Sequence, residues 1–127
     1  MEELLHKELT EVIINAFYKV YNHLGYGFLE KVYENALMYE LKSKGLFVEK
    51  QKPINVYYQQ VLVGEFYADL EVNETIILEL KASSELVYEN EVQLMNYLKA
   101  TEIEVGLLFN FGKKPEFRRK VFMNKQK

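Results

Sequence analysis

Residues 68–81 read ADLEVNETIILELK, and apolar side chains occupy every second position on both sides of a short polar break. This alternation places the apolar residues on one face of two strands that are joined by a turn. A three-residue loop at residues 73–75 brings the apolar positions opposite one another. The apolar pairs are then Val72 with Ile76 and Leu70 with Leu78. The stretch therefore predicts an antiparallel hairpin with a fixed register.

The other face of this hairpin carries two acidic side chains. In the predicted register Asp69 stands opposite Glu79, with Cβ atoms about 4.5 to 5.5 Å apart. Like charges at that separation destabilise a fold unless a cation or a proton lies between them. Lys81 projects from the same face. This combination is typical of metal-assisted phosphodiester hydrolysis, although cross-strand ion pairs on a solvated face use the same residue types.

A helix is predicted to follow the hairpin, from residue 83 or 84 to about residue 101. Asn90, Gln93 and Tyr97 have the spacing i, i+3, i+7 and therefore share one side of that helix. If this side faces the carboxylates, its polar groups can hydrogen-bond a water, a phosphate oxygen or Lys81. The alternative is that they are ordinary polar positions on a helix surface.

Periodicity elsewhere in the chain predicts an α/β fold. Thr10 is predicted to cap a first helix that ends at Gly25, and a second helix stops at Gly45. From Pro53 onward the apolar period changes to two. Strands are predicted at residues 54–58, 61–67, 68–72, 75–81 and 104–110. The order of elements predicts one domain over residues 1–127, with a mixed central β-sheet flanked by helices.

The composition limits the chemistry that the chain can carry. Its 127 residues include no Cys and two His, which excludes disulfides, zinc–thiolate sites and multi-His metal centres. Any metal must then be a hard ion held by oxygen, such as Mg²⁺ or Mn²⁺. No apolar run approaches the roughly 20 residues of a membrane span. Because Glu2 and Glu3 also interrupt the region where a secretory signal is apolar, we expect a cytoplasmic protein with no membrane partner.

The charge of the chain is unevenly distributed. The formal net charge is −3, yet residues 113–127 carry seven basic residues against the single acid Glu116. Such a basic C-terminal tail can follow the phosphates of a nucleic acid, and the alternative is a solvated end that aids solubility. The candidate phosphate-binding residues are Lys113, Lys114, Arg118, Arg119 and Lys120.

A motif near the start of the second predicted helix resembles a known family. Gly27, Glu30 and Tyr33 stand in the order Gly-x-x-Glu-x-x-Tyr, which resembles the signature of the small GxxExxY proteins of the PD-(D/E)XK nuclease superfamily. The resemblance extends over nearly the whole chain. It includes residues 67–70, 78–82, 93–101 and 106–112.

The resemblance implies a restriction-endonuclease-like fold and a role for each matching residue. Asp69 and Glu79 resemble the metal-binding acids, joined by the Leu80 backbone carbonyl, and Lys81 resembles the catalytic lysine. Gln93 and Tyr97 resemble the Gln-x-x-x-Tyr motif of exonuclease-like branches. Glu30 resembles an additional acid of the metal site, although a glutamate in a first helical turn also interacts favourably with the helix dipole. Family members often carry His where this chain has Asn90.

Two functions are consistent with these residues. The first is a Mg²⁺- or Mn²⁺-dependent nuclease that hydrolyses phosphodiester bonds, with DNA as the expected substrate. The second is an inactive scaffold domain that binds nucleic acid or protein, in which Asp69, Lys81 and Glu79 form a structural ion-pair network.

Two further expectations concern surfaces. The edge formed by residues 105–109, or the first helix, is available for a homodimer. Most aromatic residues are expected in the core because they occupy periodic positions. Examples are Phe17, Tyr33 and Phe66.

Overall fold

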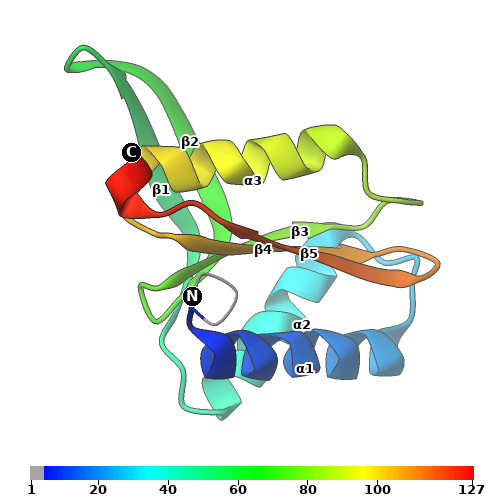
Figure 1. Cartoon of the computed structure of the whole chain (residues 1–127). Helices are drawn as coiled ribbons and strands as arrows, with labels where there is room; N and C mark the ends of the chain where they lie inside the picture. Colours follow the sequence, from blue (N-terminus) through cyan, green and yellow to red (C-terminus); the bar gives the residue numbers. More distant parts are fainter. Residues whose placement is uncertain (1–4) are drawn as a thin grey trace.

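A five-stranded mixed sheet forms the centre of the computed structural model, which describes residues 5–127 (Figure 1). The strands lie in the order β1-β2-β3-β4-β5, and β3 pairs with β4 in parallel while the other neighbours are antiparallel. The elements are α1 (Lys7–Leu24), α2 (Glu30–Ser43), β1 (Val48–Tyr58), β2 (Val61–Val72), β3 (Ile76–Lys81), α3 (Tyr88–Ala100), β4 (Val105–Phe111), β5 (Pro115–Val121) and the 3₁₀ helix η2 (Asn124–Gln126).

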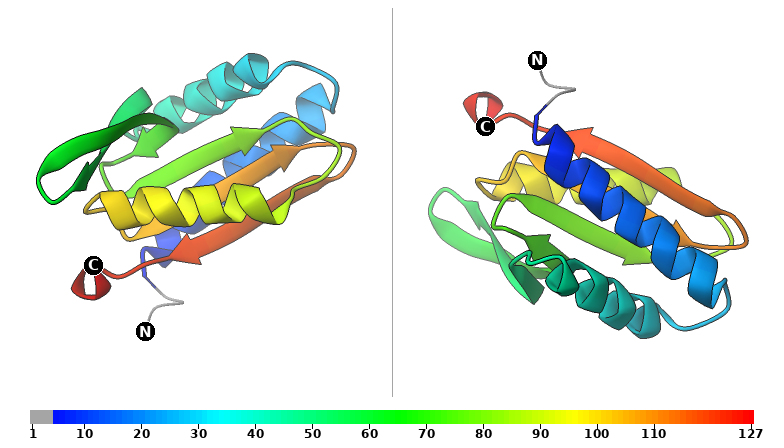
Figure 2. Two further views of the ribbon diagram at one scale, coloured as in Figure 1. Left: turned by 90° about the horizontal axis from the view of Figure 1, so that it is seen from above. Right: turned by 90° about the horizontal axis from the view of Figure 1, so that it is seen from below.

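Helices cover both faces of the sheet. α1 and α2 lie on one face, and α3, which connects the parallel strands β3 and β4, lies on the other (Figure 2). The larger core, around Phe17, Tyr33 and Phe109, fills the space on the side of α1 and α2, and a smaller core around Leu94 and Leu98 lies under α3. Because both faces are covered, every residue of β4 is buried. This arrangement confirms the α/β expectation.

The register predicted for residues 68–81 is confirmed. Val72 pairs with Ile76 and Leu70 with Leu78, and the backbone turns through Asn73 and Glu74, both at φ 52°. The side chain of Asn73 accepts the N–H of Phe47, which joins the turn to the segment before β1. Apolar burial on one face therefore set the register, as the alternation indicated.

The predicted starts of two helices are wrong. α1 begins at Lys7, three residues before Thr10, whose buried hydroxyl has no hydrogen-bond partner among residues 5–127. Lys7 and Glu8 are good helix formers and Leu9 packs on the core, so the helix extends beyond the polar residue taken as its cap. α3 begins at Tyr88 because the preceding segment is held as a loop, in which the N–H of Ser83 is bonded to Asn110.

The first two strands are longer than predicted. β1 begins at Val48 and contains Pro53, which pairs with Tyr67. β1 is an edge strand, where a missing N–H is tolerated, so proline does not mark its start. β2 runs without interruption from Val61 to Val72, where two strands were predicted.

Two further expectations are wrong. Part of the basic tail is strand β5, and its Phe117 and Val121 pack against the larger core. β4 therefore lies between β3 and β5 and provides no edge for a homodimer. Phe66 is 45% exposed, whereas Phe17 and Tyr33 are fully buried as expected.

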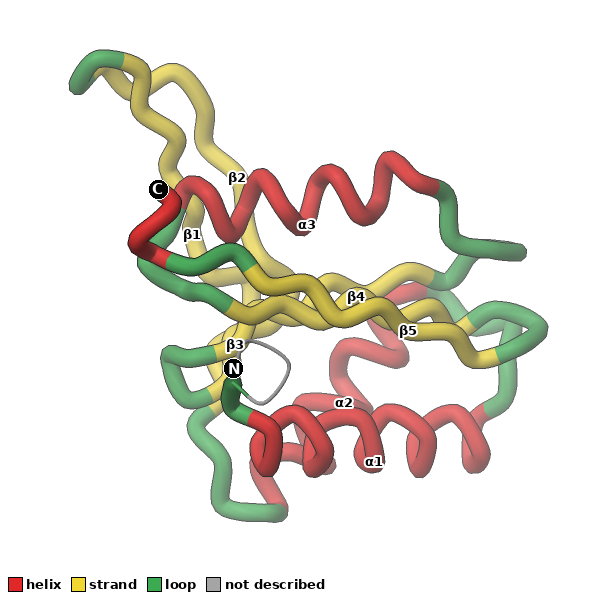
Figure 3. The backbone as a smooth tube through the Cα atoms, in the orientation of Figure 1, coloured by secondary structure: helices red, strands yellow, loops and turns green. Residues whose placement is uncertain are grey.

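The β1–β2 hairpin extends beyond the rest of the sheet and rises beside the C-terminal end of α3 (Figure 3). No helix among residues 5–127 has the length and apolar character needed to cross a membrane. Glu2 and Glu3, on which the expectation about a secretory signal rested, lie outside the described residues.

Candidate active site

Asp69 and Glu79 lie where the β2–β3 ladder ends. The last backbone pair of this ladder is Leu70 with Leu78. Beyond this pair, the acid side chains bond to the main chain of the opposite strand. Asp69 Oδ2 accepts the N–H of Leu80 at 2.8 Å, and Glu79 Oε2 accepts the N–H of Asp69 at 3.0 Å. Each carboxylate is thus fixed by one strong hydrogen bond from the main chain of the opposite strand.

Glu79 is buried and Asp69 is half-buried. Glu79 is only 4% exposed, and burial, followed by the charge of Asp69, raises its pKa to about 8. Burial also raises the pKa of Asp69, although the hydrogen bond from Leu80 opposes this change. In the metal-free fold, Glu79 therefore keeps a proton at pH values where a solvated glutamate is ionised.

Lys81 lies near the acids without being bonded to them. Its charge acts to lower the pKa of Glu79, but its ammonium forms no hydrogen bond or ion pair with any of residues 5–127. The Asp69–Lys81–Glu79 ion-pair network of the scaffold alternative is therefore not formed within the described part of the chain. The ammonium stays available for another anion or a water.

The residues of the Gly-x-x-Glu-x-x-Tyr motif shape the loop before α2 and the first turn of that helix. Gly27 has φ 110°, in the region that favours glycine. The buried hydroxyl of Tyr33 donates to the carbonyl of Gly25 at 2.6 Å and accepts the N–H of Phe28 at 3.3 Å. This closed loop sets the start of α2, with Glu30 as its first residue. Glu30 is exposed, and its charge contributes to the raised pKa of both Asp69 and Glu79.

Two residues of this site were missed in the sequence. Glu34, one helical turn after Glu30, is 6% exposed and accepts a hydrogen bond from Gln51 at 2.8 Å. Gln51 also contacts Asp69 Oδ1 at 3.5 Å and has a left-handed backbone, with φ 52°, between the pairs that Lys50 and Lys52 make. The i, i+4 spacing of the two glutamates was a usable signal. Nothing in the sequence marks a left-handed Gln51.

α3 presents two of its three predicted polar residues together. Gln93 donates to the hydroxyl of Tyr97 at 3.0 Å, and Tyr97 is 6% exposed. Burial raises the pKa of Tyr97, and Glu79 and Asp69 raise it further, so the phenol lies within the field of both acids. Asn90 instead accepts the N–H of Val87 and closes the start of α3.

A divalent ion fits the donors that remain. Among residues 5–127, no three acidic or histidine side chains come close enough together to hold an ion, so Glu30 as a further metal ligand stays a prediction. Mg²⁺ is commonly held by one or two carboxylates, with water and substrate oxygens as the other ligands. Glu79 Oε1 and the weakly bonded Asp69 Oδ1 meet that requirement. Leu80 is shown to contribute its N–H, and a role for its carbonyl stays a prediction.

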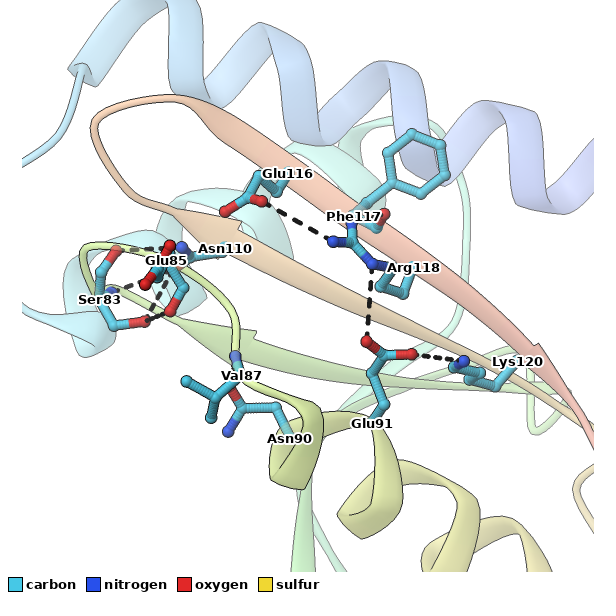
Figure 4. A network of polar contacts seen from close by, with 10 residues as sticks. All are labelled: Ser83, Glu85, Val87, Asn90, Glu91, Asn110, Glu116, Phe117, Arg118 and Lys120. Carbon is cyan, nitrogen blue, oxygen red and sulfur yellow. Dashed lines mark hydrogen bonds and ion pairs between the residues drawn. The ribbon is translucent and has the colours of Figure 1, made fainter.

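The basic residues near the C-terminus do not form one strip. Arg118 and Lys120 pair with Glu91 of α3 (Figure 4). Arg119 points the other way and donates to the carbonyl of Leu5 at 2.7 Å. Lys113 and Lys114 are exposed in the turn between β4 and β5, so these two keep their side chains in solvent.

Comparisons with known proteins agree with this geometry. A family model described as the PD-(D/E)XK nuclease superfamily matches residues 7–120. The crystal structure of SSO0001 is similar with a TM-score of 0.58 at 18% identity, which supports the fold. This chain is covered to 93% in that match and spans 60% of the SSO0001 chain. A search of the curated proteins found no match.

Replacing Glu79 with glutamine tests the charge of the acid pair. With a pKa of about 8 in the folded state and 4.5 as its ordinary value, Glu79 keeps its proton in the fold at pH values where the unfolded chain releases it. The metal-free fold therefore loses stability as pH rises from about 4.5 to 8. The amide oxygen of the introduced glutamine would accept the same Asp69 N–H without ionising. We predict that Glu79→Gln is more stable than wild type at pH 8 by at least about 1 kcal/mol.

Melting temperatures in EDTA between pH 5 and 9 measure this effect. Glu85→Gln, at an exposed position, is the control and should keep the wild-type pH dependence. A Glu79→Gln variant that loses stability with pH as steeply as wild type contradicts a buried, proton-retaining Glu79.

Replacing Gln51 with Gly and with Ala distinguishes the cost of its left-handed backbone from the loss of its side-chain hydrogen bond. Both variants lose the hydrogen bond to the buried Glu34, but only Ala retains the strain of a left-handed backbone, which costs about 1–2 kcal/mol. We predict that Gln51→Gly is more stable than Gln51→Ala by about 1 kcal/mol in urea unfolding. At Lys52, which pairs regularly with Ala68, the order should reverse. Equal stability of the two position-51 variants would show that the left-handed backbone at this position carries no strain.

Proposed function

The chain belongs to the PD-(D/E)XK nuclease superfamily, and we propose that it is a Mg²⁺- or Mn²⁺-dependent nuclease that hydrolyses phosphodiester bonds, with DNA as its substrate. One observation carries the proposal: the half-buried Asp69 and the buried Glu79 each accept a main-chain hydrogen bond from the opposite strand, and neither has a cationic partner among residues 5–127. Such a pair is stabilised by a divalent cation.

Asp69 and Glu79 would hold the ion, with the Leu80 carbonyl as a further ligand and Glu30 adding negative charge from the first turn of α2. The chemistry that Mg²⁺ or Mn²⁺ supplies at such a site is the activation of a water as the nucleophile. The hydrogen bonds from Leu80 and Asp69 fix the carboxylates before substrate binds, which avoids reorganisation during the reaction.

Lys81 would act on the phosphate. Its free ammonium can orient the attacking water or offset the negative charge that builds on the phosphate oxygens. Gln93 and Tyr97 form one hydrogen-bonded unit, whose phenol can donate to an oxygen of the bound phosphate.

Phosphate contacts farther from the reaction would come from Lys113 and Lys114, whose side chains are exposed in the β4–β5 turn. For Arg118 and Lys120, binding to nucleic acid would require exchange of their ion pairs with Glu91. We also propose that the chain is a GxxExxY protein, which is supported by the loop that Gly27 and Tyr33 build around Glu30.

Cleavage of labelled single-stranded DNA, duplex DNA and RNA in Mg²⁺ or Mn²⁺ tests the proposal. Glu79→Gln and Lys81→Met should each lower the rate by about 100-fold or more, since a single positioned group of this kind contributes at least that factor. Lys44→Met, at an exposed position beyond α2, should cleave as wild type does. EDTA should abolish cleavage in every variant.

Absence of cleavage on all three substrates by a folded wild-type protein would contradict the proposal. So would activity that survives in both Glu79→Gln and Lys81→Met.

A further inference from the structure

A groove of about 700 Å³ lies between the β1–β2 hairpin and α3. The hairpin contributes Asn55, Tyr57 and Phe66 to its lining, and α3 contributes Asn96, Tyr97 and Lys99. Figures 1 and 3 show why it exists: the hairpin rises away from the sheet beside α3. A volume of this size is typical of ligand sites.

Tyr97 relates the groove to the acid pair. This side chain lines the groove, and its hydroxyl is the one to which Gln93 donates. Asp69 and Glu79 are among the groups that raise the pKa of Tyr97, so this groove residue lies within the electrostatic field of both acids. A strand whose phosphate lies at the acids would place its neighbouring nucleotides along the groove.

Two exposed aromatic rings face this space. Tyr57 is 61% exposed and Phe66 is 45% exposed, and the Phe66 ring lies 5.9 Å from that of Tyr97. Aromatic side chains of this size ordinarily gain by burial, so their exposure beside a groove indicates a partner surface. Aromatic rings bind nucleic acids by stacking on bases, and the bases of a duplex are already stacked on each other.

Among the remaining lining groups, two amides and one ammonium suit nucleotides, and Glu89 adds a single carboxylate. Asn55 and Asn96 each offer an amide that can donate and accept hydrogen bonds at a base edge. Lys99, at the outer end of α3, offers a positive charge for a phosphate. This combination of ring, amide and ammonium matches a nucleotide chain better than it matches an apolar protein segment.

We propose that this groove binds unpaired nucleotides of the substrate, with Tyr57 and Phe66 as stacking surfaces, so that the enzyme acts on single-stranded DNA or on single-stranded ends. The proposal rests on the proposed nuclease function, whose substrate form it specifies.

The test compares two neighbouring tyrosines of one hairpin. Tyr57 lines the groove and Tyr58 does not, although the two are similarly exposed at 61% and 67%. Fluorescence anisotropy with a labelled 12-nucleotide oligo-dT in EDTA measures binding without metal-dependent cleavage. Tyr57→Ala should weaken binding at least about fivefold, Phe66→Leu should also weaken it, and Tyr58→Ala should bind as wild type does. A blunt duplex of the same length should bind more weakly than the single strand.

Several results would overturn this assignment. They are equal effects of Tyr57→Ala and Tyr58→Ala, duplex binding as tight as single-strand binding, or a wild-type dimer in gel filtration that Tyr57→Ala dissociates. The last result would assign the groove to a protein interface. Melting temperatures near that of wild type check that the variants are folded.

The two proposals fail in different ways. Binding that depends on Tyr57 without cleavage in Mn²⁺ supports the groove and contradicts the nuclease. Cleavage by a protein whose oligo-dT binding is unchanged in Tyr57→Ala supports the nuclease and contradicts the groove.

Discussion

Two like-charged side chains held against each other are the constraint on which the rest of this site depends. Asp69 and Glu79 repel, yet each is fixed by a main-chain N–H from the opposite strand. These two hydrogen bonds lie beyond the last backbone pair of β2 and β3. There the main-chain N–H groups bond to the acid side chains and not to the backbone of the opposite strand. Burial and, after it, the charge of Asp69 raise the pKa of Glu79. The fold thus retains a position that a divalent cation stabilises.

The surrounding elements adapt to this pair. Tyr33 closes the loop that begins α2 and so sets Glu30, while Gln51 takes a left-handed backbone and lies between Glu34 and Asp69. Backbone strain of this kind is concentrated at functional sites, because the surrounding structure has to maintain it. The β1–β2 hairpin departs from the sheet on the same side as α3, which leaves a groove between the hairpin and this helix. Strand β2 therefore connects the two features, because it carries Asp69 and also forms half of the hairpin that lines the groove.

The sequence predicted the hairpin register, the mixed sheet and the Gln93–Tyr97 pair, since each depends on periodicity or spacing that one segment carries. It did not predict strand β5, because three consecutive charged residues, 118–120, interrupt the alternation between Phe117 and Val121, which pack against the larger core. It missed Gln51, because its conformation is imposed by partners distant in sequence. Phe66 was assigned to the core, although the hairpin carries it out of the sheet. Periodicity within one segment therefore predicted helices, strands and their register. The positions of Gln51 and Phe66 depend on contacts between segments that are distant in the sequence.

The proposed nuclease function requires that Asp69 and Glu79 form a cation site. The most direct test is a crystal grown or soaked with Mn²⁺, with anomalous differences measured at a wavelength where manganese scatters strongly. We expect an anomalous peak between Asp69 Oδ1 and Glu79 Oε1, at the distances of metal–oxygen bonds. We also expect the Lys81 ammonium to form no bond with either carboxylate. An absent peak together with Lys81 bonded between the two acids would contradict the proposed function, since the pair would then be a structural ion-pair network.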